Sequence, residues 1–598
     1  MFRIPTPPLI QDLRHYNRLI FKGDLQAGLT VGVVLIPQAM AYAMLAGLPP
    51  VYGLYTAVFP LLIYAFLGSS RQLSMGPAAL LSLLILAGIS PLAEPQTPEY
   101  IHWAFILAMA VGLLQFALGF FRLGFLVNFL SAPVLSGFTT ASALVIMLTQ
   151  TGALFGLGPQ HGMGFPARLV HLFSSLPAMH GPTVLLGVST LMLLLGARYF
   201  FPRFPGALFA IAYGMVCSVL MDLERRGVAV LGVIPRGFPA PGIPPFEEGE
   251  LLVLLPSILS ISLMGFVISY AVARSIPIES RPQRLEPNQE LIAQGLANLG
   301  GSLFQSFPVA GSFARTAVNH QAGAHTGVSA LVSVGMVLLT VLLLTPWLHH
   351  LPLAVLGAII VVAVGDLIQW RIARHLYRTD MRDLLMLIAT FVTTLWLGME
   401  NGIVVGVVLS LSAVLYSSSR PHYAVLGRLP STTVYKNVDR FPEAEEEEGV
   451  LIIRPDARLF FGNQDYIREV VEREVALRPE AELVILDGVA ISDVDSTAVA
   501  MIRVMERELS LQGIRLRFIG LNGPVRDKLY KNNLDMVIGS NHVYTRIHDL
   551  ILQFREEGEG PTLPKQISVK PPKPGNSNQG KRSARPRSRF SNTEEDTD

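Results

Sequence analysis

The feature that most constrains this chain is the stretch from Leu25 to Ser70, which contains no charged side chain. Comparable apolar runs recur up to about Ser419, and each is long enough for the roughly 20 residues that a spanning helix needs. Of the 598 residues, 51% are hydrophobic and only 15% are charged. This composition excludes an ordinary soluble protein and predicts a multi-pass membrane protein embedded in a lipid bilayer.

Composition also divides the chain along its length. After the apolar runs the sequence becomes polar, then alternates short apolar strands with amphipathic helices, and ends in a charged, proline-rich tail that has little to bury. The predicted regions are an N-terminal segment (1–23), a transmembrane domain (24–420), a linker (421–448), a small α/β domain (449–557) and a disordered tail (558–598).

The distribution of arginine and lysine predicts the orientation in the membrane. Cations cluster in alternate loops, at 14–22, 71, 122, 198–203, 274–284 and 371–382. If the spans alternate, these loops, both termini and the α/β domain are cytoplasmic, and about 14 crossings fit. The N-terminus lacks the pattern of a signal peptide. We therefore expect a protein of the cell (inner) membrane, with a net charge of +2 that is too small to indicate a nucleic-acid partner.

Two apolar segments are too weak to cross the membrane as regular helices. They are "SMGPAALLSLL" (Ser74–Leu84) and "FPVAGSFARTAV" (Phe307–Val318), and each begins roughly fifty residues into its half of the membrane domain. Gly/Pro-interrupted segments at matching offsets predict an inverted repeat whose broken helices meet at the bilayer midplane. The alternative is that prolines only kink two ordinary spans.

A helix that begins in mid-membrane leaves its first N–H groups unpaired, and these groups favour an anion. We expect two such N-termini, near Ala78 and Ala310, with Arg315 adding a full positive charge one turn into the second helix. Alternatively, Arg315 is structural, bonded to carbonyls or reaching the membrane surface. Ser312 and Thr316 can donate to a ligand or bond back to their own helix.

Gln38 and Tyr42 lie four residues apart in the first apolar run and therefore share one helix face. Both side chains can donate hydrogen bonds in an apolar setting. Such a pair either contacts a ligand or holds two helices together.

Four stretches of the chain together resemble one known family. They are "QAMAYAMLAGLPPVYGLY", "LGSSRQLSMGPAAL", "EPNQELIAQGLANLGGSLFQSFPVAGSFARTAVNHQAGAHT" and "LPLAVLGAIIVVAVGDLI". These are similar to the signature stretches of the SulP family of anion transporters, the sulfate permeases whose animal relatives include pendrin and prestin. Near the C-terminus, "LVILDGVAISDVDSTAVAMI" resembles a STAS domain.

The resemblance implies an α-helical polytopic membrane protein with fourteen transmembrane segments in two inverted repeats of seven. A core domain carrying half-helices at segments 3 and 10 would move against a gate domain, an elevator-like form of alternating access. The implied substrate-binding residues are Gln38, Tyr42, Gly76, Pro77, Ala78, Ala79, Ile268, Val309, Ala310, Gly311, Ser312 and Arg315. Members that resemble proton-coupled symporters carry an acidic residue where this chain has Ile268, so we expect an exchanger or an uncoupled carrier.

The STAS-like segment has its own predicted elements. We expect strands at "VLIIRP", "RLFFGN", "ELVILDG" and "IRLRFIGL", and helices at "QDYIREVVEREVAL" and "STAVAMIRVMEREL". The domain is expected to mediate a homodimer. STAS domains resemble bacterial anti-sigma-factor antagonists, in which a serine of one turn is phosphorylated. Ser496 and Thr497 occupy the corresponding turn, although a residue there more simply caps the next helix. The acidic run Glu445–Glu448 is interpreted as a solvated linker.

The main functional hypothesis is a secondary transporter of small inorganic anions, with sulfate as the family default. Bicarbonate, chloride or a dicarboxylate are alternative substrates, and a membrane-tethered STAS signalling protein is an alternative of another class. We expect no enzymatic activity, no cofactor and no metal site. The adjacent His349 and His350 are interpreted as a solvated loop pair, and Cys217 as a small core residue.

Overall fold

A computed structural model describes most of the chain. The described residues are 8–14, 16–129, 131–157, 163–200, 206–232, 237, 239–245, 249–276, 285–344, 347–534 and 546–558. They fall into two units, residues 1–413 and 414–598, which are treated separately below. Apart from Gly558, the predicted disordered tail lies outside the described residues.

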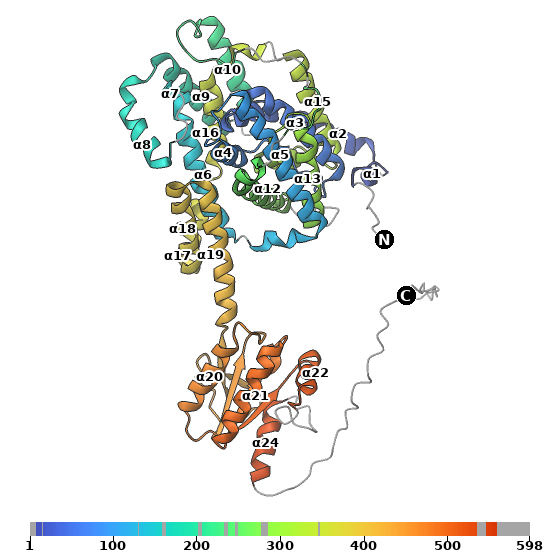
Figure 1. The fold of residues 1–598 in the computed structure, drawn as a ribbon, viewed down its shortest axis with the longest axis vertical. Coiled ribbons are helices and arrows are strands. Elements are labelled where there is room, and N and C mark those ends of the chain that lie inside the picture. Colours follow the sequence, from blue (N-terminus) through green and yellow to red (C-terminus); the bar gives the residue numbers. More distant parts are fainter. Residues whose placement is uncertain are drawn as a thin grey trace, which may run out of the picture. The chain divides into compact units, whose positions relative to one another are not determined.

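The first unit is a bundle of apolar helices (Figure 1). Eight stretches of the described residues are long and apolar enough to span a membrane: α2 (Arg18–Leu45), α3 (Pro50–Leu67), α5 (Pro98–Phe120), α6 with α7 (Ala132–Thr149, Thr151–Phe155), α9 (Gly181–Phe200), α12 (Leu255–Ser275), α16 with α17 (Leu353–Gly365, Trp370–Thr379) and α19 (Met399–Ser419). Shorter helices are α4 (Ala79–Ile89), α10 (Gly206–Leu220), α13 (Pro287–Ser302), α14 (Phe313–Gln321), α15 (Val328–Leu339) and α18 (Met381–Leu397).

These fourteen membrane helices form two series of seven, α2 to α10 and α12 to α19, with α7 and α17 continuing longer spans. The packing shows that the two series are related by internal symmetry, because the main helix contacts occur in matched pairs. The pair α2–α15 corresponds to α12–α5, and α5–α13 corresponds to α15–α3. In the same way α6–α18 corresponds to α16–α9, and α2–α14 to α12–α4. The predicted inverted repeat of seven helices is confirmed.

Two groups of helices pack within this unit. One contains α2, α3, α4, α5, α12, α13, α14 and α15, and the other contains α6, α9, α10, α16 and α18. Figure 1 shows α9 and α16 to the left of α13 and α15. This grouping corresponds to the predicted division into a core and a gate.

Close packing between α5 and α13 of the first group depends on glycine. A Cβ atom on Gly295 of α13 would lie 2.4 Å from the Phe116 nitrogen of α5, and one on Gly112 of α5 would lie 2.6 Å from the Leu299 nitrogen of α13. Small residues at such crossings let two backbones approach where lipid supplies no hydrophobic driving force. The α5–α13 pair therefore gives the core group a rigid centre.

Short connecting elements complete the first unit: α1 (Pro8–Leu13), η1 (Leu123–Phe129), α8 (Phe165–Ser174), η2 (Leu176–Ala178), α11 (Glu250–Val253), a π-helical turn η4 (Thr340–Leu344) and η5 (Trp347–His350). Two two-residue strands, β1 (Met75–Gly76) and β2 (Ala310–Gly311), lie inside it.

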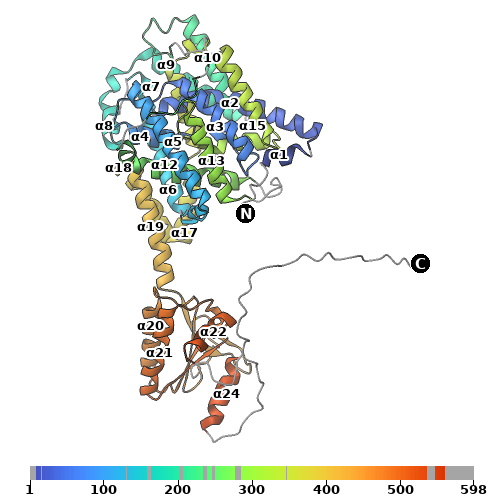
Figure 2. The ribbon, with the colours of Figure 1, turned by 45° about the vertical axis from the view of Figure 1, so that its right-hand side comes forward.

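The second unit is a five-stranded sheet covered by helices. The strands β3 (Tyr423–Arg428), β4 (Tyr435–Asn437), β5 (Val450–Pro455), β6 (Leu483–Asp487) and β7 (Arg515–Ile519) have the order β4-β3-β5-β6-β7, with β5, β6 and β7 parallel. The helices are α20 (Gln464–Ala476), α21 (Ser496–Leu511), α22 (Gly523–Lys531) and α24 (Ile547–Gly558). Figure 2 shows α20 and α21 side by side.

Side chains alternate along the strands of this sheet, so that each face has its own core. Leu451 and Ile453 of β5 belong to the cluster shared with α20 and α21, whereas Ile452 packs with Leu550 and Ile551 of α24. This alternation is the ordinary consequence of the two-residue period of a strand.

Two predictions about this region are wrong. The predicted linker 421–448 contains β3 and β4, and β3 pairs antiparallel with β5, which follows it in the sequence. A single short apolar run gives a weak local signal, and only the non-local pairing with β5 decides it. The predicted strand "RLFFGN" is a loop. There Leu459 forms an isolated parallel bridge with Val494, and Asn463 accepts from the Phe460 nitrogen at 3.0 Å and donates to the Arg458 oxygen at 2.8 Å.

In the acidic run Glu445–Glu448, three residues are exposed as predicted, but Glu447 is not. The Glu447 side chain is only 6% exposed and forms ion pairs with Arg428 at 2.7 Å and Arg555 at 2.8 Å. Hydrogen bonds from Arg478 to Glu446, at 2.5 and 2.9 Å, lower the pKa of that carboxyl group. The run therefore ties the first strands of the domain to α20 and α24.

Candidate functional site

The two interrupted segments meet at the small β1–β2 pair. Met75 lies opposite Gly311, and Gly76 lies opposite Ala310, in an antiparallel register. The Ser312 nitrogen donates to the Ser74 oxygen at 3.2 Å. Helices of 11 and 9 residues, α4 and α14, begin directly after this crossing. The prediction of two broken helices that start close together is confirmed.

The two helix N-termini are poorly capped. Ala78 stands at the N-cap of α4 and has no polar side chain, so nothing from the N-cap residue pairs with the first N–H groups. Ser312 caps α14, but its hydroxyl accepts from the Arg315 nitrogen at a long 3.5 Å. Unpaired N–H groups and two helix dipoles therefore create positive potential at one point, which favours an anion.

Arg315 places a full positive charge beside these N-termini. Its side chain is fully buried. The Nε atom donates to the Ser74 hydroxyl and the Nη1 atom to the Gln38 amide oxygen, both at 3.3 Å. The Nη2 atom is buried and has no hydrogen-bond partner among the described residues. A buried guanidinium with a free donor is costly to maintain, and an oxyanion would satisfy both its charge and that donor.

The residues predicted on α2 and α12 are buried, and one of them bonds this cation. Gln38 and Tyr42 are both buried on the same face of α2, and Gln38 contacts the guanidinium directly. Ile268 is buried on α12 next to Ser269, whose hydroxyl accepts from the Gly311 nitrogen at 2.8 Å. Ile268 itself is apolar and brings no charge.

Polar side chains hold the break open, and of those named here the sequence predicted a role only for Thr316. Asn298 accepts from the Val309 nitrogen at 2.9 Å, and the Gln294 amide donates to the Val309 oxygen at 3.1 Å. Thr316 accepts from the Ser74 nitrogen at 3.0 Å. These bonds replace the helical bonds that the interruption removes, as a buried backbone in a membrane requires. The spacing of Gln294 and Asn298, four apart on α13, was the available signal.

The remaining predicted residues divide between the two units. Gly76, Pro77, Ala78, Ala79, Val309, Ala310 and Gly311 are all buried at the crossing, and Ser312 is half-buried. Ser496 and Thr497 lie in the other unit, at the start of α21. There Asp495 caps the helix by accepting from the Ala498 nitrogen at 2.8 Å, and its second oxygen accepts from the Phe461 nitrogen at 2.8 Å.

Two half-helices that meet N-terminus to N-terminus, inside an inverted repeat, define a secondary transporter of the broken-helix class. The chain belongs to the sulfate permease family, whose sequence profile matches residues 21–390. A STAS domain profile matches residues 441–550. The family is one of transporters.

The chain is similar to named transporters over nearly its whole length. It is 36% identical over 550 residues to a probable sulfate transporter of Arabidopsis thaliana, covering 89% of this chain and 80% of that protein. It is 34% identical to a probable sulfate transporter of Mycobacterium tuberculosis, covering 92% and 98%. Its fold matches the murine Solute Carrier 26 family member A9 anion transporter in the inward-facing state, with a TM-score of 0.85, 25% identity and coverage of 93% and 95%.

Proposed function

We propose that the protein is a secondary transporter of small inorganic anions, with sulfate as its main substrate. The observation that carries the proposal is the buried Nη2 atom of Arg315, which has no partner among the described residues and lies beside two helix N-termini. The names of the relatives, which are sulfate transporters, support sulfate over other anions.

The chemistry of the site suits an oxyanion without any covalent step. Backbone N–H groups of α4 and α14 donate to its oxygens, while Arg315 balances its charge. Gly76 leaves room for an anion beside the guanidinium, because a Cβ atom there would lie 3.3 Å from the Arg315 Nη2 atom. No enzymatic activity is needed for this role.

We further propose elevator-like alternating access, in which the core group carries the anion past the gate group. Its support is the uneven covering of the site. Residues 79–85 of α4 are all buried, whereas Phe313, Ala314 and Ala317 form an exposed face on α14. An anion approaching along that face would reach Ser312 and the N-terminus of α14 first.

Coupling, orientation and assembly are also proposals. Because Ile268 cannot titrate, anion exchange or uncoupled uptake is favoured over proton-coupled symport. The alternating clusters of arginine and lysine favour cytoplasmic termini and a cytoplasmic STAS domain in the inner membrane. The STAS domain is proposed to join two copies of the chain.

The test is a flux panel with purified protein in liposomes. Labelled sulfate, bicarbonate, chloride and fumarate are supplied in turn, with and without imposed proton, sodium and counter-anion gradients. We expect sulfate flux that follows a counter-anion gradient and ignores a proton gradient. No flux of any anion, together with normal binding of STAS partners, would instead support a signalling protein.

A further inference from the structure

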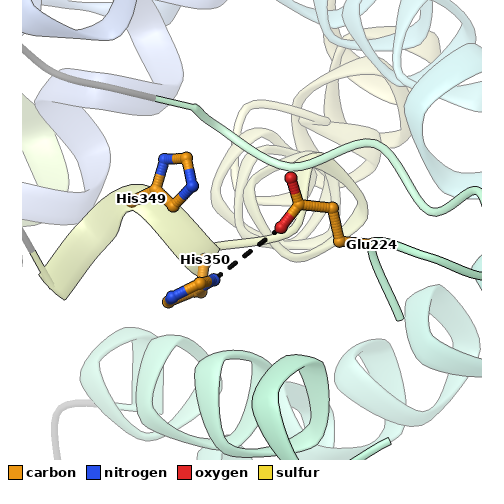
Figure 3. A group of neighbouring side chains, drawn as sticks. All are labelled: Glu224, His349 and His350. Atoms are coloured by element: carbon orange, nitrogen blue, oxygen red, sulfur yellow. Dashed lines mark ion pairs between the residues drawn. The ribbon is translucent and has the colours of Figure 1, made fainter. Parts of the chain in front are cut away.

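Glu224, His349 and His350 lie close together in the membrane unit (Figure 3). Glu224 lies in the segment that follows α10, and the two histidines end the short helix η5 before α16. Although 125 residues separate Glu224 from His349, one nitrogen or oxygen atom from each of the three side chains lies within 4.8 Å of the others.

The backbone holds the two segments in this arrangement. The Leu231 nitrogen donates to the Leu351 oxygen at 2.8 Å, and the Gly232 nitrogen donates to the His349 oxygen at 3.3 Å. These bonds belong to an antiparallel pairing of the two connecting segments. The backbone pairing of the two segments therefore fixes where these three side chains meet.

An ion pair alone does not account for the cluster. The His350 Nδ1 atom lies 3.9 Å from the Glu224 carboxylate, at the limit of an ion pair, and both side chains are about half exposed at 48% and 51%. The Nδ1 atom of His349 is buried and lacks a hydrogen-bond partner among the described residues. Neighbouring Arg225 is paired with Asp222 at 3.2 Å, which leaves Glu224 available.

We propose that Glu224, His349 and His350 bind a divalent transition-metal ion of the zinc class. Two imidazoles and one carboxylate form a donor set that Zn²⁺ prefers, with water in the fourth position. In a tetrahedral site the ligand atoms lie about 3.3 Å apart, so the half-exposed His350 and Glu224 side chains close by a small rotation. This proposal revises the expectation of no metal site. That expectation considered the adjacent histidines alone, because Glu224 is distant from them in the sequence.

The bound ion would join two connections between the groups of helices. The segment of Glu224 leads from α10, in the group containing α9 and α16, to α12 in the other group. The segment of His349 and His350 leads from α15 to α16, in the opposite direction. An ion held by both segments therefore stabilises one relative position of the two groups. This inference does not depend on which anion the protein carries.

The test is titration of the full chain with zinc chloride in detergent, after removal of any affinity tag, followed by isothermal calorimetry. We expect one Zn²⁺ per chain. Each of the variants His349→Ala, His350→Ala and Glu224→Gln should weaken binding about tenfold or more, because each removes one ligand. The matched control His171→Ala, on α8, should bind as the parent does.

A second measurement keeps the proposal testable if a variant folds poorly. Cobalt added to the parent chain should give the intense visible absorption of a tetrahedral site, and zinc should displace it. Equal zinc binding by the parent and by a chain carrying all three substitutions would overturn the proposal, as would the absence of a saturable site in the parent. Unchanged elution on size exclusion confirms that each variant is folded.

Discussion

The two half-helices α4 and α14 occupy equivalent places in the inverted repeat, yet they bring different chemistry to the anion site. Helix α4 is apolar and buried along its first two turns, and offers only its backbone N–H groups. Helix α14 carries Ser312 and Arg315 in its first turn and leaves one face uncovered. The repeat therefore supplies two similar dipoles, whereas the full charge comes from one half alone.

This difference suggests that the two half-helices contribute differently to anion binding. Backbone dipoles at α4 are fixed by burial and discriminate weakly between anions. The guanidinium at α14 is held by Ser74 and Gln38, so its position depends on three separate segments of the chain. Substitutions at the two helix starts can separate these contributions.

Arg315→Gln should remove the difference in charge between the two half-helices. Removing a buried charge within contact distance of the anion weakens binding by about 3 kcal/mol, roughly a hundredfold in sulfate affinity. Affinity is measured from labelled sulfate uptake and from the thermal stabilisation that sulfate gives. The control is Arg198→Gln, an exposed arginine paired with Asp366 at 2.5 Å, which should leave affinity unchanged. Equal sulfate affinities in the two variants would assign Arg315 a structural role.

Gly76→Ala should disturb both half-helices at their crossing. A residue with a Cβ is strained at a φ of +154°, and the added methyl would lie 3.3 Å from the Arg315 Nη2 atom. We expect uptake at low sulfate to fall by roughly tenfold, since such strain is worth about 1 to 3 kcal/mol. The control is Gly335→Ala, where nothing lies within 4 Å of the new atom. A fully active Gly76→Ala protein would show that the anion does not approach here.

Ala78→Ser tests the contribution of α4 by pairing its first N–H groups with a side chain of the protein. The new hydroxyl can accept from the first N–H groups of the helix and so compete with the anion. A cap is worth about 1 kcal/mol, which corresponds to roughly fivefold weaker sulfate binding. The control is Ala87→Ser, at an exposed position on the same helix. Tighter sulfate binding by Ala78→Ser would mean that the hydroxyl donates to the anion instead.

Ser312→Ala should have the smallest effect. Its contact with the Arg315 nitrogen is long at 3.5 Å, so the cap it removes is weak. Sulfate affinity should change by less than about twofold, measured by the same uptake assay. A tenfold loss would contradict this role and would place the Ser312 hydroxyl in direct contact with the anion.

Sequence patterns predicted the membrane unit better than the second unit, and the reason is physical. A bilayer requires long apolar helices, so Gly/Pro interruptions at 76–77 and 308–311 stand out against them. In the second unit the strand β3 depends on pairing with β5, and the burial of Glu447 depends on Arg428 and Arg555. No local pattern records such non-local partners.

The sequence by itself determined that the chain spans a membrane in a repeated arrangement with two broken helices and one embedded arginine. Hydrophobic run length and helix-breaking residues encode these features locally. Three-dimensional packing was needed to show that Arg315 meets Ser74 and Gln38, and that its Nη2 atom has no partner among the described residues. It was also needed to show that Glu224 reaches His349 and His350. Those contacts join segments that lie more than a hundred residues apart, and packing of the two repeats alone fixes them.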